Sequence, residues 1–147
     1  MARTKEPPKE NLRAIAAGCA LLGKHPLFAW LIDGSEWRPA PPSRPFPPDG
    51  FARLALSRWR DKPVIAIEAN VWRRADPAEW AHVLAQALLH EHLNHVDPAR
   101  PDEAWRIACG LVAAEFLRPL GIGRRPESLP WPAPPPGRDV AELARWL

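Results

Sequence analysis

The stretch DPAEWAHVLAQALLHEHLNH, residues 76 to 95, decides the fold of this chain. Asp76 is a good N-cap, Pro77 suits the first position of a helix, and Glu79 completes a capping box. The apolar residues that follow continue to about His95, which predicts a long helix. Three histidines and a glutamate fall within the last six residues of the stretch. Such a concentration is typical of a zinc site, so the end of this helix is the first candidate for a function.

The spacing of this cluster differs from that of the common zinc motif H-E-x-x-H, which does not occur in it. Residues three or four apart share one face of a helix, so Glu91 or His92 can pair with His95 at one metal ion. His90 lies about 100° around the helix from Glu91, toward a different face. A third ligand would have to fold in from elsewhere in the chain. The alternative is structural: a partly buried His90 interacts with the helix dipole, while Glu91 and His92 face solvent.

Further helices and a strand are predicted on either side of this stretch. Apolar residues at helical spacing predict helices over residues 9 to 22 and 102 to 117, and a short helical turn over HPLFAWL, residues 25 to 31. PVIAIEA, residues 63 to 69, is the best strand in the sequence. Residues 51 to 60 fit either a short helix or an irregular strand.

Two proline-rich segments interrupt these elements. Residues 33 to 50 predict a loop that cannot hold a regular element, and residues 125 to 147 predict an extended tail with a short helix at its end. We therefore expect one domain over residues 1 to 124, followed by this tail. The domain is expected to be α+β and mostly helical, with about four helices and a small β-sheet. Its two long helices should pack against each other.

The composition indicates a folded cytoplasmic protein. With 147 residues the chain can bury a core, and its hydrophobic content of 46% excludes wholesale disorder. No apolar run approaches the roughly 18 residues of a membrane-spanning helix, and the charged N-terminus is unlike a signal peptide. Cys19 and Cys109 lie within apolar helical patterns, where we expect buried thiols without a disulfide.

Arginine, tryptophan and proline are prominent in the segments expected at the surface. The net charge is +3, and the closest basic pairs are scattered: Arg58 and Arg60, Arg73 and Arg74, Arg124 and Arg125. They form either an ordinary basic surface or the contact surface of a nucleic-acid-associated subunit. SEWRPAPPSRPFPP and LPWPAPPPGR are either plain loops or arms that bind a partner. Tryptophan and arginine are common anchors of interfaces. The candidate partner-binding residues are Trp37, Arg38, Trp131, Arg73 and Arg74.

The order of these blocks resembles a bacterial metallopeptidase-like domain family that occurs N-terminal to von Willebrand factor A-like domains. In that family a strand ends near an asparagine, a helix carries HExxHxxxxH, and the next helix begins like W-N-x-A-x-D. The counterparts here are IEANVW with Asn70, QALLHEHLNH, and WRIACG from Trp105 to Gly110, while HPLFAWL is similar to the early helix of the family. The resemblance covers roughly residues 25 to 130 and implies a zincin-like fold.

Carried over residue by residue, the resemblance implies a degenerate site. Gln86 stands in the place of the first histidine of HExxH, and Ala87 in the place of its glutamate, the general base. His90 and His95 keep the places of the later histidines, and Gly110 replaces an aspartate of the following helix. Glutamine is a poor zinc ligand, and alanine and glycine offer no carboxylate. We therefore expect no bound metal, no cofactor and no catalytic residue, and we expect Ala87 and Gly110 to lie close together.

The leading hypothesis is a catalytically inactive, metallopeptidase-like protein that acts as a binding or scaffold subunit of a larger protein assembly. The resemblance implies MoxR-type AAA+ ATPases and von Willebrand factor A-like subunits as partners. The first alternative is a zinc-dependent hydrolase with a shifted site, in which Glu91 is the base and His90, His92 or His95 are ligands. The second is a basic accessory subunit of a nucleic-acid-associated complex, whose binding would weaken steeply with added salt.

Overall fold

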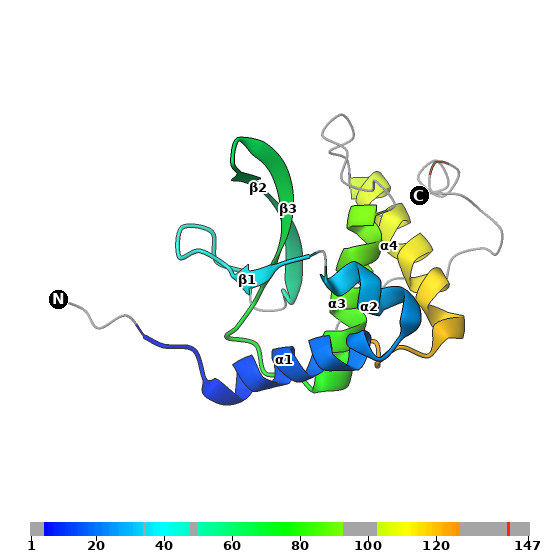
Figure 1. Cartoon of the computed structure of the whole chain (residues 1–147), viewed down its shortest axis with the longest axis horizontal. Coiled ribbons are helices and arrows are strands. Elements are labelled where there is room, and N and C mark those ends of the chain that lie inside the picture. The colour runs from blue at the N-terminus through cyan, green and yellow to red at the C-terminus, as the bar shows by residue number, and fades with distance from the viewer. Residues whose placement is uncertain (1–4, 34, 48–49, 93–102, 127–140, 142–147) are drawn as a thin grey trace.

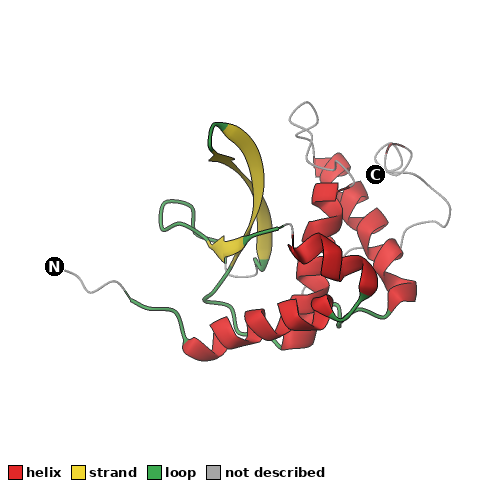
Figure 2. Ribbon diagram, in the orientation of Figure 1, coloured by secondary structure: helices red, strands yellow, loops and turns green. Residues whose placement is uncertain are grey.

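The computed structural model describes residues 5–33, 35–47, 50–92, 103–126 and 141 (Figure 1). Within these ranges the chain forms four α-helices, one 3-10 helix and three strands. In chain order they are α1 (Lys9–Gly23), α2 (Pro26–Asp33), β1 (Trp37–Pro39), β2 (Ala52–Trp59), β3 (Lys62–Ala69), α3 (Pro77–His92), α4 (Glu103–Leu117) and the 3-10 helix η1 (Arg118–Leu120). This confirms the expected α+β class with mostly helical structure and a small sheet (Figure 2).

The sheet is mixed and has the strand order β1-β3-β2. β2 and β3 form an antiparallel hairpin, and its two turn residues, Arg60 and Asp61, have φ angles of 49° and 62°. Positive φ at both central residues matches the twist of a two-residue hairpin. β1 pairs with β3 in parallel on the other side. β3 is therefore the central strand, which fits its apolar sequence.

The expectation that residues 33 to 50 hold no regular element is wrong, because β1 forms within them. β1 has three residues, lies at the edge of the sheet and ends at Pro39. An edge strand tolerates proline because one side of its backbone needs no partner. Residues 52 to 59 form a regular strand, paired with β3 along its length. In both cases the partner strand, which the local sequence does not reveal, decides the structure.

α1 packs against α3 at a glycine. A Cβ atom at Gly18 would lie 2.8 Å from the Cβ of Trp80, so only glycine allows this approach. Trp80 is fully buried, and its ring meets the ring of Phe51 edge-on with 5.4 Å between centroids. Asn11 Nδ2 donates a hydrogen bond to the carbonyl oxygen of Val71 at 3.0 Å. These contacts connect α1 both to α3 and to the segment that follows the sheet.

α3 begins at the predicted capping box. The backbone N–H of Asp76 donates to the Glu79 carboxylate at 3.3 Å, and the Asp76 carboxylate is ion-paired with Arg124. The predicted end of this helix near His95 lies outside the described residues, as does nearly all of the tail predicted over residues 125 to 147.

In the view of Figures 1 and 2, α2, α3 and α4 lie to the right of the sheet, and α1 runs below it to the N-terminal end of α3. α3 packs against α1, α2 and α4, and Ala113 and Leu117 of α4 join the buried cluster that α3 forms, so the two long helices pack together as expected. Cys109 is buried and Cys19 is half-buried, and neither forms a disulfide bond. Of the helices in the described part of the chain, none is long and apolar enough to cross a membrane.

Candidate functional site

The positions where the resemblance implies a metal ligand and a base are part of the packed core. Gln86 and Ala87 lie on α3 and are only 9% and 7% exposed. Ala87 belongs to the same buried cluster as Leu88. Within the described residues, no three His, Cys, Asp or Glu side chains form a group that could hold a metal ion. His95 lies outside those residues.

The remaining members of the histidine cluster lie at the C-terminal end of α3. His90 is half-buried and His92 is exposed. Glu91 is not solvent-facing as expected but half-buried, and Ser35 Oγ lies 3.3 Å from its Oε2 atom and 3.1 Å from the carbonyl oxygen of Leu31. Glu91 thus connects α3 to the end of α2. Its contacts give it a structural role.

Gly110 lies on α4, the helix that packs against α3. The expected closeness of Gly110 and Ala87 stays a prediction.

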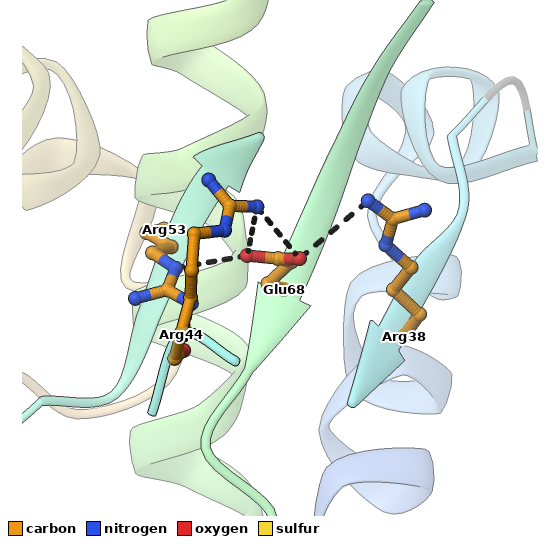
Figure 3. Close-up of polar contacts among 4 residues, drawn as sticks. All are labelled: Arg38, Arg44, Arg53 and Glu68. Carbon is orange, nitrogen blue, oxygen red and sulfur yellow. Dashed lines mark hydrogen bonds and ion pairs between the residues drawn. The ribbon is translucent and has the colours of Figure 1, made fainter. Parts of the chain in front are cut away.

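A separate cluster of charged side chains lies on the sheet around Glu68 of β3 (Figure 3). The Glu68 carboxylate is fully buried and is contacted by three arginines. Arg53 Nε donates to Oε1 at 2.8 Å, Arg44 Nη2 lies 3.3 Å from both oxygens, and Arg38 Nη2 lies 3.5 Å from Oε2. Arg53 and Arg44 approach the carboxylate from one side and Arg38 from the other (Figure 3).

The pairing of the strands produces this arrangement. Arg53 of β2 and Arg38 of β1 are both in register with Glu68 of the central strand. Side chains directly opposite each other lie on the same face of a sheet and contact one another. Arg44 is brought to the same place by the proline-rich loop between β1 and β2, so the cluster depends on four separate segments: the three strands and this loop.

The arginines keep the Glu68 carboxylate charged. Burial alone would raise its pKa, but the hydrogen bond from Arg53 and the charges of Arg44, Arg53 and Arg38 outweigh burial and hold the pKa below its ordinary value of 4.5. The side chains of Arg38 and Arg44 are 44% and 56% exposed, whereas Arg53 is 30% exposed. One buried anion therefore gathers three cations, two of which reach the surface.

Arg53 also fastens the proline-rich loop to the sheet. Its guanidinium donates to the backbone carbonyl of Arg44 and lies 4.5 Å from the ring centroid of Phe46. At the other end of the loop, Asn70 Nδ2 donates to the carbonyl oxygen of Gly50 at 2.8 Å. Side chains thus hold the loop at two places, to β2 at Arg44 and Phe46 and to the residue after β3 at Gly50.

A groove of about 500 Å³ lies between this loop and the segment that follows β3. Its lining combines prolines of the loop with Phe46, Trp72, Lys5 and Arg73. Trp72 is 50% exposed, and Lys5 Nζ lies 5.6 Å from the centroid of its ring. The Arg73 guanidinium lies 3.8 Å from the ring centroid of Phe51. The groove therefore offers flat apolar surfaces beside two positive charges.

The predicted partner-binding residues are placed in different environments. Arg38 belongs to the Glu68 cluster, Arg73 lines the groove, and Arg74 is exposed next to it in the chain. Trp37 is half-buried and packs against the hydrophobic core. Trp131 lies outside the described residues. Two of these residues thus lie near the proline-rich loop: Arg38 in the Glu68 cluster and Arg73 in the groove.

The basic pairs of the sequence lie on separate elements. Arg60 is in the hairpin turn, and Arg73 and Arg74 follow β3. Arg124 is ion-paired with carboxylates at the start of α3, and Arg125 lines a second cavity.

Sequence reasoning missed Lys5, Arg53, Glu68 and Trp72 as residues of the site, whereas Arg44 lies in SEWRPAPPSRPFPP, the segment predicted to be either a plain loop or a binding arm. One signal for them exists in the sequence. Glu68 is the single acidic residue in the apolar strand PVIAIEA, and a buried carboxylate at such a position requires cationic partners.

Comparison of the chain with models of known protein families, with curated proteins and with solved structures finds no match.

Proposed function

We propose that this chain is a catalytically inactive, metallopeptidase-like protein that acts as a binding subunit of a larger protein assembly. The observation that carries the proposal is the groove between the proline-rich loop and the segment after β3, beside the arginines around Glu68. A rigid loop backbone lowers the entropy lost on binding, because prolines restrict it before the partner arrives. Exposed Trp72 supplies an aromatic anchor of the kind that dominates interface energetics.

The charges on this surface favour an acidic partner. Lys5 and Arg73 line the groove, and Arg44 presents a half-exposed guanidinium from the same loop. A protein segment that carries an apolar side chain between acidic residues matches this combination of a flat apolar surface and positive charges. We propose such a segment of a MoxR-type ATPase or a von Willebrand factor A-like subunit as the occupant of the groove.

The surroundings of α3 support the absence of catalysis. A hydrolytic zinc site needs an open coordination position and a carboxylate base next to a bound water. The counterparts of a ligand and the base, Gln86 and Ala87, are buried within the domain. Glu91, the candidate base of a shifted site, contacts Ser35. A zinc-dependent hydrolase and a nucleic-acid-associated subunit are the alternatives, which metal analysis and salt-dependent capture of nucleic acid distinguish.

The experiment compares two tryptophan variants in affinity capture from the native host. Trp72→Ala removes a half-exposed tryptophan from the wall of the groove, whereas Trp30→Ala removes a 78% exposed tryptophan on α2 that does not line it. We expect wild type and Trp30→Ala to capture the same protein partner in similar amounts, and Trp72→Ala to capture at least about tenfold less of it. Equal capture by both variants would contradict the groove as the binding site.

Two further measurements test the alternatives. Metal analysis of the purified protein is expected to find well under one zinc per chain. Stoichiometric zinc that disappears in His90→Ala would overturn the inactive assignment. Capture of nucleic acid that falls steeply between about 50 and 200 mM salt would favour the nucleic-acid alternative instead.

A further inference from the structure

β2 forms one edge of the sheet along its whole length. The strand order β1-β3-β2 gives it β3 as a neighbour on one side, and all eight of its residues are paired with that strand (Figure 3). Among the described residues, no strand pairs with its other side. The backbone groups on that side are therefore available to a further strand, which would extend the sheet.

The two-residue turn of Arg60 and Asp61 determines which backbone groups point to this free edge. In such a hairpin the residues that flank the turn, Trp59 and Lys62, exchange both of their backbone hydrogen bonds. Because the pattern alternates, the odd-numbered residues of β2 bond to β3. The even-numbered residues from 52 to 58 direct their N–H and C=O groups outward.

Two hydrogen bonds outside the hairpin agree with this alternation. The N–H of Asn70 donates to the carbonyl oxygen of Phe51 at 2.8 Å, which continues the odd-numbered series. The N–H of Ile67, which is in register with Leu54, donates away from β2 to the carbonyl oxygen of Glu36 at 2.9 Å. The even-numbered positions of β2 therefore do not use their backbone groups to bond β3.

The two edges of the sheet differ in their protection against a further strand. β1 has only three residues and ends at Pro39, which has no N–H to donate. β2 has eight residues, contains neither proline nor glycine, and pairs with β3 without a bulge. Arg53 does not guard this edge, because its Nε is held 2.8 Å from Glu68 of the central strand. β2 therefore has the features of an edge that accepts another strand.

We propose that the free edge of β2 pairs with β2 of a second copy of this chain, in antiparallel orientation about a two-fold axis. The three strands of each copy then form one continuous sheet with the order β1-β3-β2-β2-β3-β1. A two-fold contact uses the same residues on both sides, so the strand must complement itself. The proposal is independent of the proposed function of the groove.

The strand complements itself in one register. Outward-directed residues must stand opposite each other, so even-numbered residues pair only with even-numbered residues of the second copy. With Ala52 opposite Arg58, Leu54 is opposite Leu56, and four pairs exchange backbone hydrogen bonds: 52 with 58, 54 with 56, 56 with 54 and 58 with 52. A shift by two residues in either direction leaves three pairs. The first register has the most hydrogen bonds and places leucine opposite leucine.

The arginines of β2 do not oppose one another in this register. Arg53 is opposite Ser57 of the second copy, and Arg58 is opposite Ala52. Positions 53 and 58 belong to opposite faces of the sheet, since the faces alternate along a strand. A parallel pairing in register would instead bring each arginine beside its own copy, where like charges repel. The charges of the strand thus favour the antiparallel pair.

Amide hydrogen exchange of the full chain, followed by NMR over a concentration series, tests the pairing without a variant. Arg53, Ala55 and Ser57 donate to β3 in the monomer, so their amides should exchange slowly at every concentration. The amides of Leu54 and Leu56 should exchange rapidly in dilute protein. They should exchange at least about tenfold more slowly at concentrations where sedimentation shows a dimer.

Three outcomes of this experiment would overturn the proposal. The first is a chain that stays monomeric up to about 1 mM, because even a small interface should associate at that concentration. The second is a dimer in which the amides of Leu54 and Leu56 gain no protection, which would place the contact on another surface. The third is slow exchange of these amides in the monomer, which would show that the edge is already covered within one chain.

Variants of Ser57 test the register. Ser57→Glu places a carboxylate opposite Arg53 of the second copy, and Ser57→Lys places a positive charge there. We expect the dissociation constant of the dimer to fall about threefold or more in Ser57→Glu and to rise by a similar factor in Ser57→Lys. Ala16→Glu and Ala16→Lys make the same changes of charge at an exposed position of α1 and should leave it unchanged. Equal effects of the two Ser57 variants, or the same opposite shifts at Ala16, would contradict this register.

Discussion

Arg53 and Glu68 lie directly opposite each other on β2 and β3, and Arg53 Nε donates to Glu68 Oε1 at 2.8 Å. The pair lies near the open end of the β2–β3 hairpin, with Arg38 in register on the far side of the same carboxylate. A slip of one residue in either pairing would move the arginine to the opposite face of the sheet and leave a buried carboxylate without its partner. The cluster therefore specifies the register of both strand pairs.

Glu68→Gln removes the charge of this cluster and keeps the shape of the side chain. We expect it to lower the free energy of unfolding by about 2 kcal/mol, less than the 3–5 kcal/mol of a fully buried pair because the arginines are partly exposed. Urea denaturation measures the change. Glu115→Gln, which breaks a surface pair with Arg118, is the control and should stay within about 0.5 kcal/mol of wild type. Equal losses in the two variants would contradict a special role of Glu68.

The same variant should respond differently to acid. The pKa of Glu68 in the folded chain lies below its ordinary value of 4.5, so the unfolded state binds a proton first. The stability that Glu68 contributes is fully present above that value and is lost as the pH falls through the lower, folded pKa. We expect the difference in unfolding free energy between wild type and Glu68→Gln to shrink as the pH falls below 4.5. A difference that is constant with pH would show that it does not come from the charge.

Two glycines of α1 offer a matched test of helix packing. At Gly18 a new Cβ would meet Trp80 Cβ at 2.8 Å, whereas at Gly23 it would meet nothing within 4 Å. Gly18→Ala should therefore destabilise the protein by about 1–3 kcal/mol despite the better helix propensity of alanine. Gly23→Ala should be neutral or stabilise it by up to about 1 kcal/mol. Thermal unfolding of both variants measures the change in stability. A Gly18→Ala variant as stable as wild type would mean that α1 and α3 are less closely packed.

The segment after η1 offers a second matched pair. Gly121 and Gly123 have φ angles of 61° and 62°, but only at Gly123 would a Cβ meet another atom, the Ala78 carbonyl oxygen at 2.2 Å. Gly121→Ala should lower the free energy of unfolding by about 1–2 kcal/mol, the usual penalty for a non-glycine residue in the left-handed conformation. Gly123→Ala should lower the free energy of unfolding by more than this and should also break the contact between the His82 ring and Ile122. Urea denaturation and the NMR signal of His82 report the two effects, and equal losses would contradict the close approach.

The sequence predicted the elements whose signals are local. The capping box at Asp76 and Glu79, the helical spacing around Ile15, and the apolar run of β3 each act within a few neighbouring residues, and each element formed. β1 was missed because its signal is not local. Three residues of a proline-rich segment become a strand only when the edge of β3 is available to pair with them.

The candidate site was predictable only in part for the same reason. Arg38 and Arg73 were recognised as residue types that bind partners, but the sequence does not show that Arg38, Arg44 and Arg53 share one carboxylate. That arrangement arises from strand register and from the course of a loop. The histidine cluster attracted attention because its residues are close in sequence, whereas His82, which among the described histidines has a buried nitrogen without a hydrogen-bond partner, lies apart from it.

The hydrogen bond from Asn11 to Val71 joins residues 60 positions apart. During synthesis, α1 is made before α3, and the residues that cover its buried face, in α3 and after β3, leave the ribosome later. Its apolar face must therefore wait, exposed or held by a chaperone, until most of the domain has emerged. A nascent chain stalled before α3 would contain α1 without the residues that cover its apolar face. After release of the whole domain from the ribosome, α1 should dock rapidly onto α3 rather than lengthen slowly as a helix.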